Sequence, residues 1–223
     1  MNQKWIVIMG ILLAGIAVLL AAGMGLAKQM PAEVPGETEI TLEPTEETSL
    51  QLPDAMLYYG EIQKIRRDGD GKPEALQMLS PRDGAYVMNL GEKTRYIDSG
   101  ERKCFDPGIL EEGQRYYVFC SPVQARTLPP QSPAFAVVGN IPMDAGCAMY
   151  HEAEKMQNRD GTWQITTDHG NLTLELDAAS TVLDYAGNQT DLSALQEGGF
   201  FMAWYWNQGE EVVHASHIMV LPE

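Results

Sequence analysis

The side chains best suited to hold a soft metal ion gather in one short stretch. Cys147 and His151 lie four residues apart, with Met143 and Met149 beside them. Thiolate, imidazole and thioether groups together suit a soft metal such as copper. By residue type, Cys147 and His151 are candidate metal ligands. Their spacing matches no standard metal motif, however, so we expect no bound cofactor.

Two other clusters could bind metal by residue type, but their geometry argues against it. The segment Asp68-Gly69-Asp70-Gly71 begins like a calcium loop but lacks the later ligands and the closing glutamate. We expect a hairpin turn there. His214 and His217 lie three apart on a predicted strand, so their side chains should point to opposite faces. They are not expected to chelate one ion.

Catalytic signatures are missing from the sequence. It contains no Gly-x-Ser-x-Gly elbow, no zinc-binding helix motif and no phosphate-binding glycine loop. The three cysteines, Cys104, Cys120 and Cys147, are an odd number, so at least one thiol is free or pairs between chains. The sequence predicts a protein that is not an enzyme.

The amino-terminal segment, residues 1–27, is expected to direct the protein to a membrane. Lys4 precedes an uncharged run from Trp5 to Ala27, which is long enough to cross a bilayer. A cleaved signal peptide is the alternative, because Gly25-Leu26-Ala27 has the small residues of a cleavage site. The positive charge before the run places the rest of the chain outside the cytoplasm. The expected location is the cell membrane, through a single span, or the secreted fraction.

Residues 28–54 are expected to form a disordered acidic linker. They contain seven acidic residues against Lys28 alone, four prolines and no aromatic residue. Such a segment cannot bury enough apolar surface to offset the entropy lost on ordering.

Residues 55–142 and 150–223 are two copies of one sequence pattern, joined by a connector at 143–149. The offset between equivalent residues drifts only from 86 to 80, which indicates a tandem duplication. Equivalent residues include Met88 and Leu174, Thr94 and Ser180, Asp98 and Asp184, Gly113 and Gly198, and the closing Ile141-Pro142 and Leu221-Pro222.

Each copy is predicted to be a small β-barrel. Alternating, β-branched and aromatic segments lie between turn signals such as Asp83-Gly84 and Asp160-Gly161. An acidic cap followed by about one helical turn, at 106–110 and 191–195, precedes a late strand in each copy. This order is typical of an OB-like barrel. The expected fold class is all-β, with two tandem small OB-like β-barrels. In the first copy we expect strands at 57–67, 74–79, 85–90, 94–98, 114–121 and 134–141.

The two copies differ in charge. Residues 55–142 contain 11 acidic and 11 basic residues, whereas residues 148–223 contain 12 acidic residues against Lys155 and Arg159. An acidic second copy repels phosphate backbones, so no nucleic-acid partner is expected.

A proline-rich stretch in the first copy carries a family resemblance. The sequence from Tyr117 to Ala134, YVFCSPVQARTLPPQSPA, resembles uncharacterised extracytoplasmic domains of Gram-positive bacteria. Those domains share a hairpin of the form Pro-x-x-x-Arg/Met-x-Leu/Ile-Pro-Pro-Gln-Ser and often lie beside a copper-amine-oxidase N-terminal-like stalk domain. The resemblance implies a location in the cell envelope. This chain has no recognisable stalk domain, and its second copy has Asn207-Gln208-Gly209-Glu210 in place of the proline hairpin.

The proline hairpin is the first candidate binding surface. Its prolines stiffen the backbone and cannot donate to a β-ladder, so the segment should project from the sheet. It could dock another protein, or it could pack over a barrel end or between the two copies. The protein-binding candidates are Arg126, Leu128, Pro129, Pro130 and Gln131.

The aromatic run from Phe200 to Trp206 is the second candidate surface. On a strand, one set of side chains fills the barrel and the alternate set faces outward. We expect the outward set to pack against the first copy. Alternatively, Trp204 and Trp206 could offer platforms to a cell-wall glycan.

These features predict a non-enzymatic envelope protein whose paired modules dock another protein. The alternative is a small-ligand binder for a glycan or a soft metal.

Overall fold

The computed structural model describes residues 52–142 and 147–223, which belong to one compact unit. The expected signal or anchor segment at 1–27 and the linker up to residue 51 lie outside the described residues. Within the described part, no helix has the length and apolar character needed to span a membrane. The expected all-β class is confirmed, with 52% strand and 4% helix.

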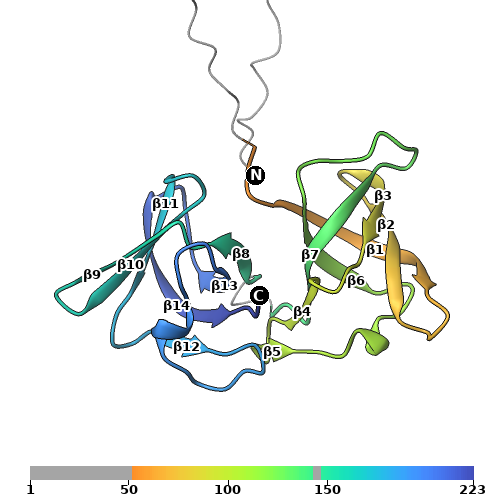
Figure 1. The fold of residues 1–223 in the computed structure, drawn as a ribbon. Coiled ribbons are helices and arrows are strands. Elements are labelled where there is room, and N and C mark those ends of the chain that lie inside the picture. Colours follow the sequence, from red (N-terminus) through yellow and green to blue (C-terminus); the bar gives the residue numbers. More distant parts are fainter. Residues whose placement is uncertain (1–51, 143–146) are drawn as a thin grey trace, which may run out of the picture. The chain divides into compact units, whose positions relative to one another are not determined.

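The first module is a closed five-stranded barrel (Figure 1). Its ring order is β3-β2-β1-β6-β7, and a parallel pairing of β3 with β7 closes it. The short strands β4 and β5 extend the sheet from β7. The elements are β1 (Met56–Arg67), β2 (Pro73–Ser80), β3 (Gly84–Asn89), β4 (Arg95–Asp98), β5 (Lys103–Cys104), the 3-10 helix η1 (Pro107–Ile109), β6 (Arg115–Cys120) and β7 (Gln131–Gly139).

Alternating side chains fill this barrel. Ile62, Leu76 and Met88 are each 0% exposed and point into one core, whereas Gln63 and Gln77 beside the first two are exposed. The turn between β1 and β2 is closed by Asp68, whose Oδ1 accepts hydrogen bonds from the backbone of Asp70 (3.0 Å) and Lys72 (2.8 Å). The predicted hairpin turn is therefore confirmed at this segment.

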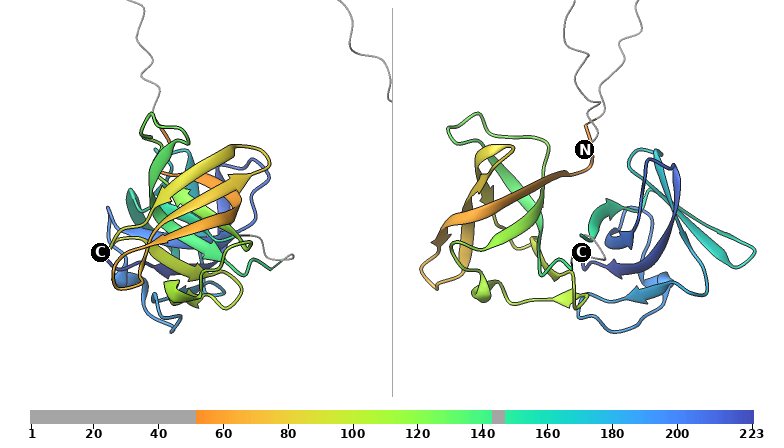
Figure 2. Two further views of the ribbon diagram at one scale, coloured as in Figure 1. Left: turned by 90° about the vertical axis from the view of Figure 1, so that its right-hand side faces the viewer. Right: turned by 180° about the vertical axis from the view of Figure 1, so that it is seen from behind.

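The second module repeats this strand order but forms a half-barrel (Figure 2). Its sheet order is β8-β13-β14-β11-β10-β9, and β12 also pairs with β14. The elements are β8 (Met149–Glu152), β9 (Lys155–Arg159), β10 (Thr162–Thr167), β11 (Leu172–Leu176), β12 (Thr181–Leu183), the 3-10 helix η2 (Leu192–Ala194), β13 (Phe200–Tyr205) and β14 (Val212–Val220).

The prediction of a second closed barrel is wrong, and the reason is a break in one strand. In the first module, continuous β1 pairs with both β6 and β2. In the second, the chain is interrupted at Ala153 and Glu154, so β8 pairs with β13 and the separate β9 pairs with β10. β8 begins at Met149, the last residue of the predicted connector 143–149.

Register is shared by the two modules. In β6–β7 Val118 lies opposite Val137, and in β13–β14 Ala203 lies opposite Ile218. Both strand pairs have a register shift at the equivalent point, which lies after Phe119 in β6–β7 and after Trp204 in β13–β14. The short helical turns predicted before the late strands are present as η1 and η2.

The modules pack against each other through equivalent strands. Met202 and Trp204 on β13 point away from their own module's core and join a cluster with Phe119 on β6. Ile97 on β4 and Leu183 on β12 occupy equivalent positions in the same cluster. The expected packing of the outward aromatic face against the first copy is therefore confirmed for Met202 and Trp204, whereas Phe200 and Trp206 on the same face are 41% and 72% exposed.

Candidate functional site

The predicted docking residues lie in the connection between β6 and β7 of the first module (Figure 1). Leu128 is 99% exposed, so the alternative that this part of the loop packs over a barrel end is wrong for its tip. Arg126 and Pro129 are also exposed, and Pro130 is half-buried. Gln131 is the first residue of β7 and forms a bridge with Ala125. Gln131 is therefore part of the sheet, which corrects its assignment to the projecting loop.

Backbone and side-chain hydrogen bonds order this loop. The Thr127 N–H donates to the Ala125 carbonyl at 2.8 Å, and the Thr127 hydroxyl donates to the Pro129 carbonyl at 2.8 Å. The Pro130 carbonyl accepts from the N–H of Val87 on β3 at 2.9 Å. The exposed leucine is thus held on a loop that is anchored at both ends.

The predicted pair of glycan platforms does not form. Trp204 is only 2% exposed, and its indole N–H donates to the carbonyl of Ser99 at 3.1 Å across the module interface. Its side chain is used in packing, so its assignment as a glycan-binding residue is wrong. Trp206 lies two residues beyond and is 72% exposed, but it stands without Trp204 as a second platform.

Cys147 and His151 do not share a metal-ligand group. The Cys147 thiol lies 3.1 Å from the Ala148 carbonyl, and burial raises its pKa to about 12. The metal ligand is the thiolate, which this environment disfavours. All three cysteines carry free thiols.

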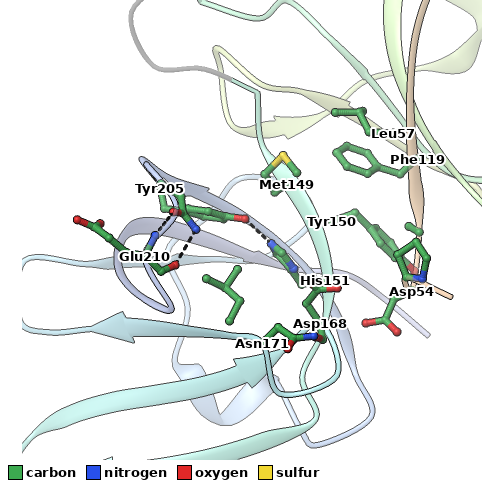
Figure 3. A pocket seen from close by; sticks show the side chains of 14 residues that line it. Asp54, Leu57, Phe119, Met149, Tyr150, His151, Asp168, Asn171, Tyr205 and Glu210 are labelled. Carbon is green, nitrogen blue, oxygen red and sulfur yellow. Dashed lines mark hydrogen bonds between the residues drawn. The ribbon is translucent and has the colours of Figure 1, made fainter. Parts of the chain in front are cut away.

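His151 instead lines a cavity of about 340 Å³ where the two modules meet (Figure 3). Leu57 and Phe119 of the first module and the segment before β1 form one part of its wall, and β8, β11, β13 and two turns of the second module form the other part. The lining residues are Pro53, Asp54, Ala55, Leu57, Phe119, Met149, Tyr150, His151, Asp168, Asn171, Leu172, Tyr205, Asn207 and Glu210.

The polar centre of the cavity wall is a hydrogen-bonded histidine. His151 Nε2 lies 3.0 Å from the Tyr205 hydroxyl, and its Nδ1 lies 3.3 Å from the Thr167 hydroxyl. Burial lowers the pKa of His151 to about 4 and raises that of Tyr205 to about 12. Both groups are uncharged at neutral pH, so they offer hydrogen bonds without charge.

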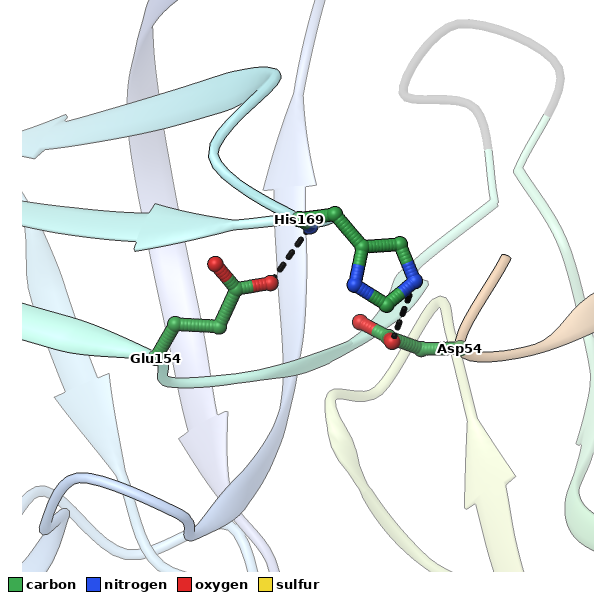
Figure 4. Close-up of side chains that lie close together, drawn as sticks. All are labelled: Asp54, Glu154 and His169. Atoms are coloured by element: carbon green, nitrogen blue, oxygen red, sulfur yellow. Dashed lines mark hydrogen bonds and ion pairs between the residues drawn. The ribbon is translucent and has the colours of Figure 1, made fainter. Parts of the chain in front are cut away.

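A second polar cluster lies at the edge of this cavity and consists of Asp54, Glu154 and His169 (Figure 4). Asp54 precedes β1, Glu154 lies in the break between β8 and β9, and His169 lies in the β10–β11 turn. His169 Nε2 lies 3.3 Å from Asp54 Oδ1 and 2.7 Å from the Leu52 carbonyl oxygen. The His169 backbone N–H donates to the Glu154 carboxylate.

The charges of this cluster perturb one another. The hydrogen bond to the Leu52 carbonyl and the nearby carboxylates raise the pKa of His169. Burial is the main cause that raises the pKa of Asp54, and Glu154 and Asp168 add to it. Among the residues that the structure describes, this is the group of three or more His, Cys, Asp or Glu side chains able to share an ion.

Sequence reasoning missed this cluster. Asp54 was assigned to the acidic linker, and Glu154 and His169 form no motif because they lie 15 residues apart. The one local signal is the Asp168-His169-Gly170-Asn171 turn, in which Asp168 and His169 both have positive φ values of 55° and 56°.

Comparison with known proteins gives no relatives: no family model, no curated protein and no solved structure matches this chain.

Proposed function

We propose that this chain is a non-enzymatic extracytoplasmic protein that docks another protein through the loop between β6 and β7. Residues 1–27 would tether it to the cell membrane or be removed on secretion, and the acidic linker would separate the body from the membrane surface. The order of the closed ring, with β3 parallel to β7, supports an OB-like assignment for the first module.

The single observation that carries the docking proposal is the exposure of Leu128. A leucine that is 99% exposed on a hydrogen-bonded loop leaves its apolar surface in water. Burying that surface against a partner would gain roughly 1.5–3 kcal/mol. Because the loop is already ordered, little conformational entropy would be lost on binding.

Two further features support contact through the first module. Val123, in the same connection, is 67% exposed and adds apolar surface. The first module is electrically balanced and presents Arg126 on this loop, whereas the second carries a large excess of acid. Anionic partners would be repelled by the second module and tolerated by the first.

In-cell photo-crosslinking from position 128 of the full-length chain tests this proposal. We expect one discrete protein adduct from a photoreactive residue at 128, and we expect the purified adduct partner to bind the wild-type chain. The Leu128→Ser variant should lose at least 10-fold in affinity, because a buried leucine side chain contributes about 1.5–3 kcal/mol.

Ile109 provides the matched control. It lies in the same module, on η1, and is 61% exposed. The Ile109→Ser variant should bind the partner as wild type does. Equal binding by the Leu128→Ser variant, or the absence of an adduct at 128, contradicts the proposal.

A second candidate function is small-ligand binding in the cavity between the modules. The observation that favours it is the convergence of uncharged donors and acceptors, His151 and Tyr205, with aromatic walls such as Phe119. Pockets of this composition fix the orientation of a small polar ligand. Calorimetry with soluble cell-wall glycan fragments tests it, and the Tyr205→Phe variant should bind them more weakly while Trp206→Ala binds normally.

A further inference from the structure

We propose that Asp54, Glu154 and His169 bind a divalent transition-metal ion, for which Zn²⁺ is the test ion. The ion would link the segment before β1 to the second module. This proposal is independent of docking by the β6–β7 loop, because none of its three residues lies in that loop.

The donor set of the cluster combines nitrogen and oxygen. One imidazole nitrogen and two carboxylate oxygens, all within 4.8 Å of one another, come from three separate parts of the chain. Imidazole and carboxylate ligands suit zinc, and three protein ligands leave a fourth position for water. Magnesium and calcium prefer sites made only of oxygen ligands.

Two of the donor atoms already have the spacing of neighbouring zinc ligands. Zinc bonds of 2.0–2.1 Å in a tetrahedron place neighbouring ligand atoms about 3.3 Å apart. His169 Nε2 and Asp54 Oδ1 are already 3.3 Å apart. Glu154 uses one oxygen for the His169 backbone N–H, which leaves its second oxygen as a donor (Figure 4). To complete the set, the Glu154 carboxylate must move inward and His169 Nε2 must exchange its hydrogen bond to the Leu52 carbonyl for the ion.

Negative charge gathers around the cluster. Burial, followed by repulsion from Glu154 and Asp168, raises the pKa of Asp54, and burial, followed by repulsion from Asp54 and Glu154, raises the pKa of Glu152. Within residues 52–142 and 147–223, no lysine or arginine forms an ion pair with any of the four carboxylates Asp54, Glu152, Glu154 and Asp168. In this part of the chain, the one ion pair that involves any of them joins Asp54 to His169. A bound dication would balance this excess of negative charge.

The cluster is partly sheltered from solvent but still open to it. The side chains of His169 and Asp54 are 32% and 20% exposed. The cluster is thus partly withdrawn from water, which strengthens its attraction for an ion, but an ion can still reach it from solvent.

Calorimetry on the metal-free full-length chain tests the site. We expect one Zn²⁺ per chain and at least ~10-fold weaker binding in the His169→Ala and Glu154→Gln variants, since even indirect changes around a metal cost this much. Zinc should also raise the melting temperature of the wild type, because an ion that binds only the folded state stabilises it. Mg²⁺ should not compete.

His214 supplies the matched control. It is also an exposed histidine beside a carboxylate, with Nε2 at 3.2 Å from Asp177 Oδ1, but it has no second carboxylate in a ligand group. The His214→Ala variant should bind Zn²⁺ as wild type does. Circular dichroism of each variant separates lost binding from lost folding.

Cobalt substitution identifies the ligands even if a variant unfolds. Co²⁺ at this site should give visible absorption of a nitrogen and oxygen environment without a thiolate charge-transfer band. A thiolate band, undiminished Zn²⁺ affinity in the folded His169→Ala variant, or no Zn²⁺ binding by the wild type would each overturn the proposal.

Discussion

The two modules share their hydrogen-bond framework but differ in barrel closure. The shared hydrogen bonds stabilise the fold, and the difference in closure coincides with the candidate site. The Gly113 N–H donates to the Ile62 carbonyl at 2.7 Å, and the Gly198 N–H donates to the Ala153 carbonyl at 2.7 Å. Both glycines have a φ of 84°, a conformation that favours glycine. These turns are equivalent although Ile62 lies in a continuous strand and Ala153 at a strand break.

Side-chain bonds repeat in the same way. The Thr94 hydroxyl donates to the Ala134 carbonyl, and the Ser180 hydroxyl donates to the Ala215 carbonyl, both at 2.8 Å. These bonds join the loop before the short strand β4 or β12 to the last strand of each module. The shared framework therefore fixes the strand order in both modules.

The difference lies in one strand and has a consequence for the site. Where β1 bends and continues, its counterpart is interrupted at Ala153 and Glu154. The interruption places Glu154 beside His169 rather than in a regular ladder. The two modules thus share the framework, and the interrupted strand in the second module lies beside a polar cluster.

The largest expected effect is a loss of stability when the module interface is mutated. It tests whether the equivalent strands β6 and β13 contribute equally to the free energy of unfolding. Phe119→Ala and Trp204→Ala should each lower the free energy of unfolding by about 3–5 kcal/mol, because both side chains are buried in the shared cluster. Urea denaturation followed by circular dichroism measures this loss.

Trp206→Ala is the control for this prediction. Trp206 is 72% exposed, so its removal should change stability by no more than about 0.5 kcal/mol. If Trp204→Ala lowers the free energy of unfolding as little as Trp206→Ala does, the module interface is not a significant source of stability.

The second expected effect concerns two histidines with opposite responses to pH. Burial lowers the pKa of His151 from 6.5 to about 4, so the unfolded state binds a proton between these values and the folded state does not. The contribution of His151 to the free energy of unfolding is fully present above pH 6.5. It falls by up to roughly 3 kcal/mol as the pH drops toward 4. The raised pKa of His169 acts in the other direction, so its contribution is present at low pH and is lost as the pH rises through the folded-state pKa.

Unfolding free energies measured between pH 7.5 and 4.5 check this sign. Replacement of His151 by glutamine should reduce the decrease in the free energy of unfolding as the pH falls. Replacement of His169 should not reduce that decrease. Tyr205, which faces His151, does not titrate in this range because its pKa is raised to about 12. An unchanged acid slope in the His151→Gln variant contradicts the assignment.

Much of the fold was predictable because its signals are local. Alternation along Leu172–Leu176 and the Asp68 turn specify strands and hairpins within a few residues. The face of Trp204 was also predictable, because period-two alternation assigns it opposite to Phe201, and one of these two faces must leave the barrel.

The site was not predictable because its contacts are distant in sequence. The bond between His169 and the Leu52 carbonyl spans 117 residues and depends on how the modules pack. The break at Ala153 has no proline or glycine to mark it, so half-closure of the second module left no signal either. Cys147 and His151 were candidate ligands by residue type and nearness in sequence, but the His151 ring hydrogen-bonds with Tyr205 and Thr167 instead.

The smallest expected effect compares the two helical turns before the late strands. The Asp106 carboxylate caps η1 by accepting the Gly108 N–H at 2.7 Å, whereas the equivalent Asp191 makes no side-chain cap bond at η2. Asp106→Ala should therefore destabilise the protein by about 1 kcal/mol, and Asp191→Ala by no more than a few tenths. Paired thermal melts of the two variants at one pH resolve this difference. Equal losses would mean that the carboxylate stabilises both turns through its charge rather than through the cap bond, and the two modules would then be more alike than their hydrogen bonds indicate.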